Sequence, residues 1–176
     1  VGILQTVHLV AAGALRDEGL LAGSGEVGAG GVAGAIWWKI GVIVIALGGA
    51  ITGGIARIAP QVWRIVAPNP SPLTGPGTNS YVIGQTRPVV IDPGTPDTAH
   101  LELIMDVASG ALDRIVCTHS HPDHSPGAAE LRSRTGARVL GLPAPSDPYQ
   151  DPSYAPDTVL RDGESVSHPE FRLRVV

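Results

Sequence analysis

The most constraining feature of the sequence is the run His119-Ser120-His121-Pro122-Asp123-His124, which directly follows an apolar segment at residues 114–118. Three of the six histidines in the chain lie in this run. Neutral imidazole and carboxylate groups are donors for zinc, iron and manganese. In an extended chain His119 and His121 point to the same side, whereas Asp123 and His124 follow a turn and can reach a second position. The run therefore predicts a metal site at the end of a strand; the alternative is a surface histidine cluster without function.

The segments around this run alternate between strand and helix patterns. Short β-branched stretches predict strands at residues 54–58, 62–66, 80–83, 88–91, 114–118 and 139–140, the early ones antiparallel. Leu101, Ile104, Met105 and Ala108 have helical spacing, which predicts a helix that Asp97 or Thr98 caps and Gly110 ends. A second helix is expected at residues 128–134, closed by Gly136. This order predicts a layered α/β domain with the histidine run where a strand gives way to a helix.

Composition divides the chain into two parts. Most of the 23 glycines lie before residue 61, whereas every proline except Pro60 follows it. We therefore expect a boundary near residues 53–60, with a Gly/Ala-rich leader at residues 1–52 and the α/β domain at residues 53–176. At this length the chain can bury a substantial core.

The leader carries two weak motifs. Ile40–Ala56 is uncharged and is flanked by Trp37, Trp38 and Arg57, so residues 37–57 could form a membrane anchor or, at their end, the first strand of the domain. Glycines 23, 25 and 28 match the spacing of a dinucleotide-binding turn, but no strand precedes them and no acidic residue follows at the required distance. Chance spacing explains this second match better.

Two further residues lie close to the histidine run in the predicted fold. Asp92 ends a strand, so its carboxylate would either accept hydrogen bonds from the Pro93-Gly94 turn or orient a metal-binding histidine from behind. Cys117 is the only cysteine, which excludes an internal disulfide and predicts a small buried side chain.

The charge distribution limits the classes of partner. The formal net charge is −4, and acidic residues outnumber arginines after residue 60. This pattern gives no basic stripe for duplex nucleic acid, although it leaves room for a small single-strand site. With no signal peptide pattern at its start, the chain is expected to be cytoplasmic, or alternatively membrane-anchored through residues 37–57.

The histidine run together with residues 89–94 (VVIDPG) resembles the metallo-β-lactamase superfamily of hydrolases. The similarity covers roughly residues 54–176. Residues 67–70 (APNP) and 77–81 (GTNSY) are similar to the subgroup that includes the β-lactamase-like endoribonucleases. The resemblance implies an αββα sandwich, of which this chain holds the N-terminal half.

The resemblance also implies a metal-dependent hydrolase with two zinc ions, or with iron or manganese. His119 and His121 would bind the first ion, and Asp123 and His124 the second. A metal-bound hydroxide would attack an ester, thioester, lactam or phosphodiester, with Asp123 orienting the nucleophile or moving its proton. The substrate would be a small ester or thioester, or single-stranded RNA, bound beside the loop at residues 68–81.

Further ligands of the superfamily follow a later strand such as residues 171–176, and this sequence stops at Val176. His168 precedes that strand in an expected turn and is not assigned as a ligand. The first expectation is thus a hydrolase for the full-length parent. The alternatives are a non-catalytic truncated fragment with an incomplete metal site and a membrane-tethered module.

Overall fold

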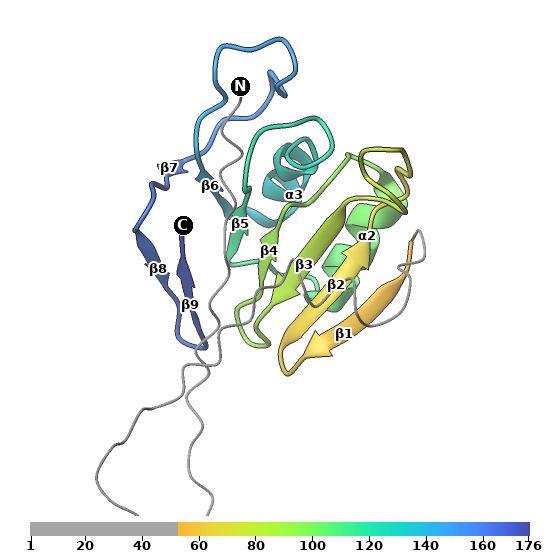
Figure 1. Ribbon diagram of the computed structural model, residues 1–176. Helices are drawn as coiled ribbons and strands as arrows, with labels where there is room; N and C mark the ends of the chain where they lie inside the picture. The colour runs from red at the N-terminus through yellow and green to blue at the C-terminus, as the bar shows by residue number, and fades with distance from the viewer. Residues whose placement is uncertain (1–52) are drawn as a thin grey trace, which may run out of the picture.

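The computed structural model describes residues 53–176, which form one mixed sheet with helices on one face (Figure 1). The seven strands lie in chain order across the sheet: β1 (Ile55–Ala59), β2 (Val62–Val66), β3 (Asn79–Ile83), β4 (Val89–Ile91), β5 (Arg114–Val116), β6 (Arg138–Gly141) and β7 (Thr158–Val159). Strands β1 to β4 pair antiparallel, and β4 to β7 pair parallel. The predicted antiparallel start is confirmed, and so are the predicted strands.

The two helices make the crossovers that parallel strands require. Helix α2 (Thr98–Val107) joins β4 to β5, and helix α3 (Gly127–Thr135) joins β5 to β6. Asp97 caps α2, since its carboxylate accepts a hydrogen bond of 2.8 Å from the His100 amide. Gly136 ends α3 in the left-handed conformation, with φ of 72°. Both predicted helices and their end signals are confirmed, with Gly110 closing the turn that follows α2.

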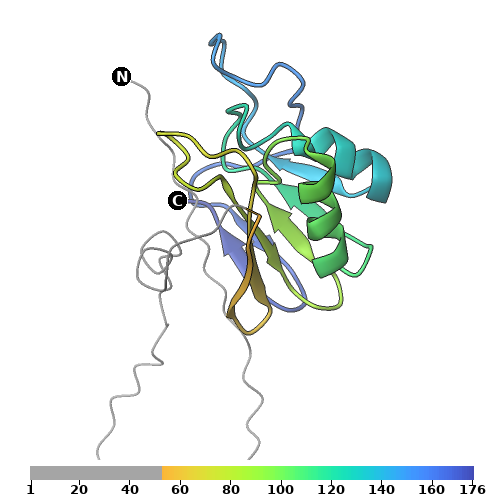
Figure 2. The same cartoon turned by 90° about the vertical axis from the view of Figure 1, so that its right-hand side faces the viewer.

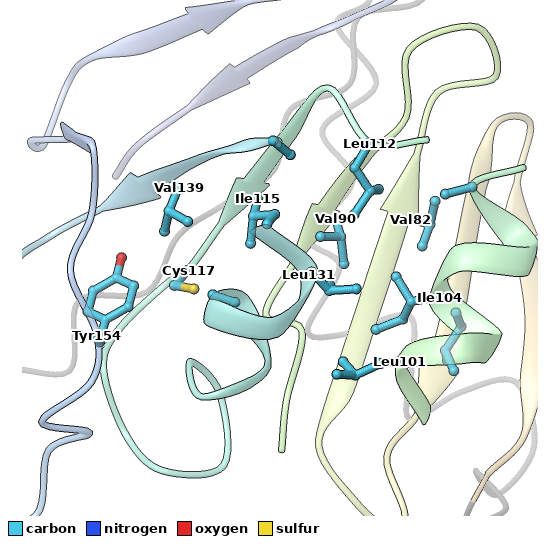
Figure 3. Close-up of a cluster of buried hydrophobic side chains, with 14 residues drawn as sticks. Val82, Val90, Leu101, Ile104, Leu112, Ile115, Cys117, Leu131, Val139 and Tyr154 are labelled. Carbon is cyan, nitrogen blue, oxygen red and sulfur yellow. The ribbon is translucent and has the colours of Figure 1, made fainter. Parts of the chain in front are cut away.

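Both helices lie on the same face of the sheet, as Figure 2 shows. Their apolar side chains meet alternate residues of the central strands, among them Leu101, Ile104, Leu131, Val90 and Ile115 (Figure 3). Each of these five side chains is fully buried. Cys117 and Tyr154 belong to the same cluster, so the predicted burial of Cys117 is confirmed.

A hairpin covers part of the opposite face. Strands β8 (Ser165–Ser167) and β9 (Arg172–Arg174) pair antiparallel, and their inward residues Val166 and Leu173 contact the apolar cluster on that side of the sheet. Helices, sheet and hairpin thus build three layers of the predicted α/β sandwich. The order of the layers confirms the expected fold class.

Among residues 53–176, no helix is long and apolar enough to cross a membrane. The leader at residues 1–52, its glycine motif and most of the segment at residues 37–57 lie outside the described residues. The end of that segment enters β1, as the alternative interpretation predicted.

Candidate metal centre

The candidate site lies at the carboxyl ends of β4 and β5. Parallel pairing of Ile91 with Val116 places the residues that follow these strands side by side. The Asp92 amide continues the ladder by donating a hydrogen bond of 2.9 Å to the Val116 carbonyl. Asp92 and Thr118 therefore meet at the strand ends, and the histidine run begins there, in the connection between β5 and α3 (Figure 1).

The Asp92 carboxylate contacts the histidine loop and not its own turn. One oxygen accepts a hydrogen bond from the Thr118 amide at 2.7 Å, and the other accepts one from the Thr118 hydroxyl at 2.7 Å. The second oxygen also lies 3.0 Å from Nδ1 of His124. The Gly94 amide instead donates to the His124 carbonyl at 2.9 Å. Of the two roles expected for Asp92, the contacts match the orientation of a loop histidine.

Thr118 determines which nitrogen of His119 carries the proton. The Thr118 hydroxyl has one proton and donates it to Asp92, so it must accept from Nδ1 of His119, which lies 2.8 Å away. The neutral ring then has its lone pair on Nε2. This is the tautomer that a histidine ligand needs when it binds a metal through Nε2.

The three imidazoles of the loop lie in contact. The ring centroid of His119 lies 4.6 Å from that of His121 and 4.0 Å from that of His124. Nε2 of His124 lies 3.4 Å from a carboxylate oxygen of Asp123, and that oxygen accepts a hydrogen bond of 3.3 Å from the Thr78 hydroxyl. All four predicted ligands thus lie in one cluster, and the loop at residues 68–81 reaches it through Thr78.

Burial and charge move two histidine pKa values in opposite directions. Burial, reinforced by the neighbouring His124, lowers the pKa of His119 to about 4, so this ring is neutral at pH 7. Burial also acts to lower the pKa of His124, but the contacts with Asp92 and Asp123 outweigh it and raise that pKa. The cluster therefore contains one imidazole held neutral and one that carboxylates hold closer to protonation.

The donor set fits zinc in its chemistry but is not arranged as a closed cage. Neutral imidazoles and a carboxylate at a strand end are suitable ligands. In the described part of the chain, however, no group of three or more His, Cys, Asp or Glu side chains converges to hold a metal ion. The rings pack against one another edge-on or tilted, and His124 faces the two carboxylates. The residues can supply ligands, whereas a metal would have to draw their donor atoms together.

His168 lies at the opposite end of β5. It follows β8 in the hairpin turn, stacks on Phe171 with ring centroids 4.1 Å apart, and places Nε2 3.9 Å from the carboxylate of Asp113. Asp113 precedes β5, so His168 does not approach the histidine loop. His168 therefore lies apart from the four predicted ligands, and it was not predicted to be one of them.

Sequence reasoning missed the residues that support the site. Ser80 on β3 donates a hydrogen bond of 2.6 Å to the Asp92 carbonyl and lies 2.9 Å from Nε2 of the buried His100. Asp151, in the segment between β6 and β7, accepts a hydrogen bond of 2.8 Å from the Ser125 hydroxyl. Asp151 is only 4% exposed, and such burial of a carboxylate indicates a structural or functional role. No sequence pattern reveals this burial.

The chain belongs to the metallo-beta-lactamase superfamily, whose sequence profile matches residues 73–174. It is 34% identical over 87 residues to the beta-lactamase-like protein 2 homolog of Drosophila melanogaster, covering 47% of this chain and 30% of that protein. It is 37% identical over 81 residues to the atrochrysone carboxyl ACP thioesterase of Passalora fulva, covering 44% and 24%. It is 38% identical over 79 residues to the hydroxyacylglutathione hydrolase of Acidiphilium cryptum, covering 43% and 32%.

Solved structures agree on the fold. BJP-1, a subclass B3 metallo-beta-lactamase of Bradyrhizobium japonicum, superposes with a TM-score of 0.54 at 17% identity, over 69% of this chain and 50% of that one. FEZ-1 of Legionella gormanii superposes with a TM-score of 0.54 at 16% identity, over 69% and 52%. The chain thus spans about half of these structures and about a third or less of the three relatives named above.

Proposed function

We propose that the chain is part of a zinc-dependent hydrolase that cleaves a thioester or a related small ester. The observation that carries this proposal is the cluster of His119, His121, His124 and Asp123 at the end of β5. The lowered pKa and the tautomer of His119 support it, because both prepare a neutral nitrogen for a cation.

The residues divide into two pairs in this proposal. His119 and His121 would hold one zinc ion, and Asp123 and His124 would contribute to a second. Bound zinc would supply Lewis acidity, which lowers the pKa of water and stabilises negative charge on oxygen. Asp123 would orient water and take up its proton, since its carboxylate is fixed by the Thr78 hydroxyl on one side and faces His124 on the other. Asp92 would hold His124 and, through Thr118, His119.

A thioester is the favoured substrate because a thioesterase is among the relatives and the chain has an excess of acidic residues. Single-stranded RNA, which the resemblance to the endoribonuclease subgroup implied, is the second substrate class. A polyanion would meet a net charge of −4 and a loop at residues 68–81 that has no basic residue, so we place RNA behind a small acyl substrate.

The test is a zinc titration of the 176-residue chain and of the His121→Ala variant, with His168→Ala as the control. We expect His121→Ala to weaken zinc binding by at least about 100-fold, because it removes a ligand, and His168→Ala to leave it unchanged. Hydrolysis of a generic acyl thioester and of single-stranded RNA by the complete reading frame then separates the two substrate classes. Equal zinc affinity of His121→Ala and the parent chain would disprove the assignment.

A further inference from the structure

We propose that Asp151 is a positioning residue, which holds the turn that presents His121 and His124. The inference rests on the proposed function in so far as it concerns zinc affinity. The order that Asp151 imposes on the turn is independent of any metal.

The turn between His121 and Ser125 is short and closed by main-chain hydrogen bonds. The amides of His124 and Ser125 both donate to the His121 carbonyl, at 2.9 and 3.2 Å. Any movement of Ser125 therefore moves the backbone that carries His121 and His124.

Asp151 forms hydrogen bonds at both ends of this turn. Its amide donates a hydrogen bond of 2.6 Å to the Ser120 carbonyl, just before the turn. Its carboxylate accepts from the Ser125 hydroxyl at 2.8 Å, just after the turn. The neighbouring Gln150 adds a side-chain contact, because its amide oxygen accepts a hydrogen bond of 2.6 Å from the Ser120 hydroxyl. One short segment, which contains Gln150 and Asp151, thus holds the residues at both ends of the turn in the histidine loop.

Burial makes these contacts costly to lose. Asp151 is 4% exposed, Ser120 2% and Ser125 1%. The second carboxylate oxygen of Asp151 accepts hydrogen bonds from the amide and hydroxyl of Ser153, so both oxygens of the buried group are satisfied. A buried carboxylate is tolerated only when such bonds are made, and its partners are left unsatisfied when it is removed.

Apolar packing also attaches the segment that contains Asp151, because Tyr154 belongs to the buried cluster between the helices and the sheet. A cavity of about 130 Å³ lies between α3 and the segment of Asp151, and Ser125, Ser153 and Tyr154 are among the residues that line it. The contacts that join this segment to the histidine loop itself are the hydrogen bonds to Ser120 and Ser125. Asp92 contacts Thr118 and His124. Asp151 instead contacts Ser120 and Ser125, so the two carboxylates hold different parts of the loop.

The experiment compares Asp151→Ala with Asp157→Ala in the full 176-residue chain. Asp157 is the matched control, because it lies in the same segment but bonds the Val139 amide at 2.8 Å and pairs with Arg132. Amide hydrogen exchange of His124 and Ser125 reports on the turn without metal, and a zinc titration reports on ligand placement. Thermal unfolding of both variants gives the stability change for comparison.

We expect Asp151→Ala to speed exchange of the His124 and Ser125 amides at least about tenfold and to weaken zinc binding about tenfold. Asp157→Ala should change neither, although it destabilises the fold. Ser125→Ala should reproduce both effects if Asp151→Ala does not fold, and Asp151→Asn should largely restore both, since its amide can still bond the Ser125 hydroxyl.

Unchanged exchange of the two amides in Asp151→Ala, or in Ser125→Ala, would overturn the inference. Faster exchange with unchanged zinc affinity would overturn it as well, because the turn would then not position the ligands. If the parent chain binds no zinc, the proposed function fails, whereas faster exchange still shows that Asp151 orders the turn.

Discussion

The two ends of strand β5 both carry carboxylates, but they face different partners. At the amino end, Asp113 pairs with Arg87 and, at 3.2 Å, with Arg114. At the carboxyl end, Asp92 faces Thr118 and His124, and Asp123 faces Thr78 and His124. Arginine is always protonated, whereas imidazole and hydroxyl partners need not carry any charge.

This difference explains why only one end suits a cation. Fixed guanidinium charges compensate Asp113, so this carboxylate has little negative charge to offer a cation. The partners of Asp92 and Asp123 leave the carboxylates largely uncompensated when the imidazoles are neutral. The lowered pKa of His119 keeps that ring neutral, whereas the raised pKa of His124, which faces both carboxylates, favours its protonated form. An incoming zinc ion would therefore meet the free lone pair of neutral His119 and, once His124 has lost its proton, the negative charge of Asp92 and Asp123 at the carboxyl end.

The largest expected effect on stability comes from replacing glycines near the two ends of β5 by alanine. Gly77 belongs to the loop that reaches Asp123, has φ of 142°, and would place a Cβ atom 1.9 Å from the Ala67 carbonyl oxygen. Gly110, in the turn before β5, has φ of 77° and open space around it. We expect Gly77→Ala to cost at least about 3 kcal/mol and Gly110→Ala about 1 kcal/mol in denaturant unfolding. Similar costs for the two would mean that the Gly77 loop can move aside.

The next effect comes from the carboxylates themselves. Asp92→Ala removes a buried carboxylate and leaves the half-buried Thr118 amide and hydroxyl without this acceptor, so we expect a loss of about 2–3 kcal/mol in free energy of unfolding. Asp113→Ala removes ion pairs with half-exposed arginines and should cost about 1 kcal/mol or less. Urea titrations of the two variants measure the difference. A larger loss for Asp113→Ala would reverse the comparison.

The smallest expected effect is a difference in the pH dependence of stability between groups near the two ends of β5, measured in the metal-free chain. Burial lowers the pKa of His100 and His119 below the ordinary 6.5, so the unfolded chain binds protons that the fold excludes, and stability falls as pH drops below 6.5. His124 opposes this in part, since its raised pKa stabilises the fold below 6.5 and that stability is lost as pH rises through the folded pKa.

The amino end responds at lower pH. The carboxylate of Glu170 accepts hydrogen bonds from the amides of Gln85, Thr86 and Arg87. Burial opposes ionisation, but the three amides together outweigh it and lower the pKa of Glu170, so its contribution is present above 4.5 and is lost as pH falls through the folded value. In unfolding measured from pH 7 to 3, His100→Gln should flatten the decline that starts near 6.5, and Glu170→Gln only the part below 4.5. A single decline that both variants change equally would contradict this.

Local patterns predicted most of the fold. The spacing of Leu101, Ile104 and Ala108 gave α2, and Gly136 gave the end of α3, because both signals depend on residues within a few positions. The four candidate ligands were also predicted together, since they lie in one short loop. Their support could not be predicted, because Ser125 and Asp151 are 26 residues apart and their contact depends on the course of an irregular segment. Nothing in the sequence distinguishes Asp151 from Asp147 or Asp157, which lie nearby and face other partners.

The segment of Asp151 has a consequence for the order of synthesis. The contacts described here for the histidine loop join residues between Thr78 and Asp151, all of which leave the ribosome before β8 and β9. Domains generally fold as units while the chain is still growing. A nascent chain that has reached β7 therefore already contains both supports of the loop, and the hairpin joins a sheet whose ligand-bearing edge can be in place.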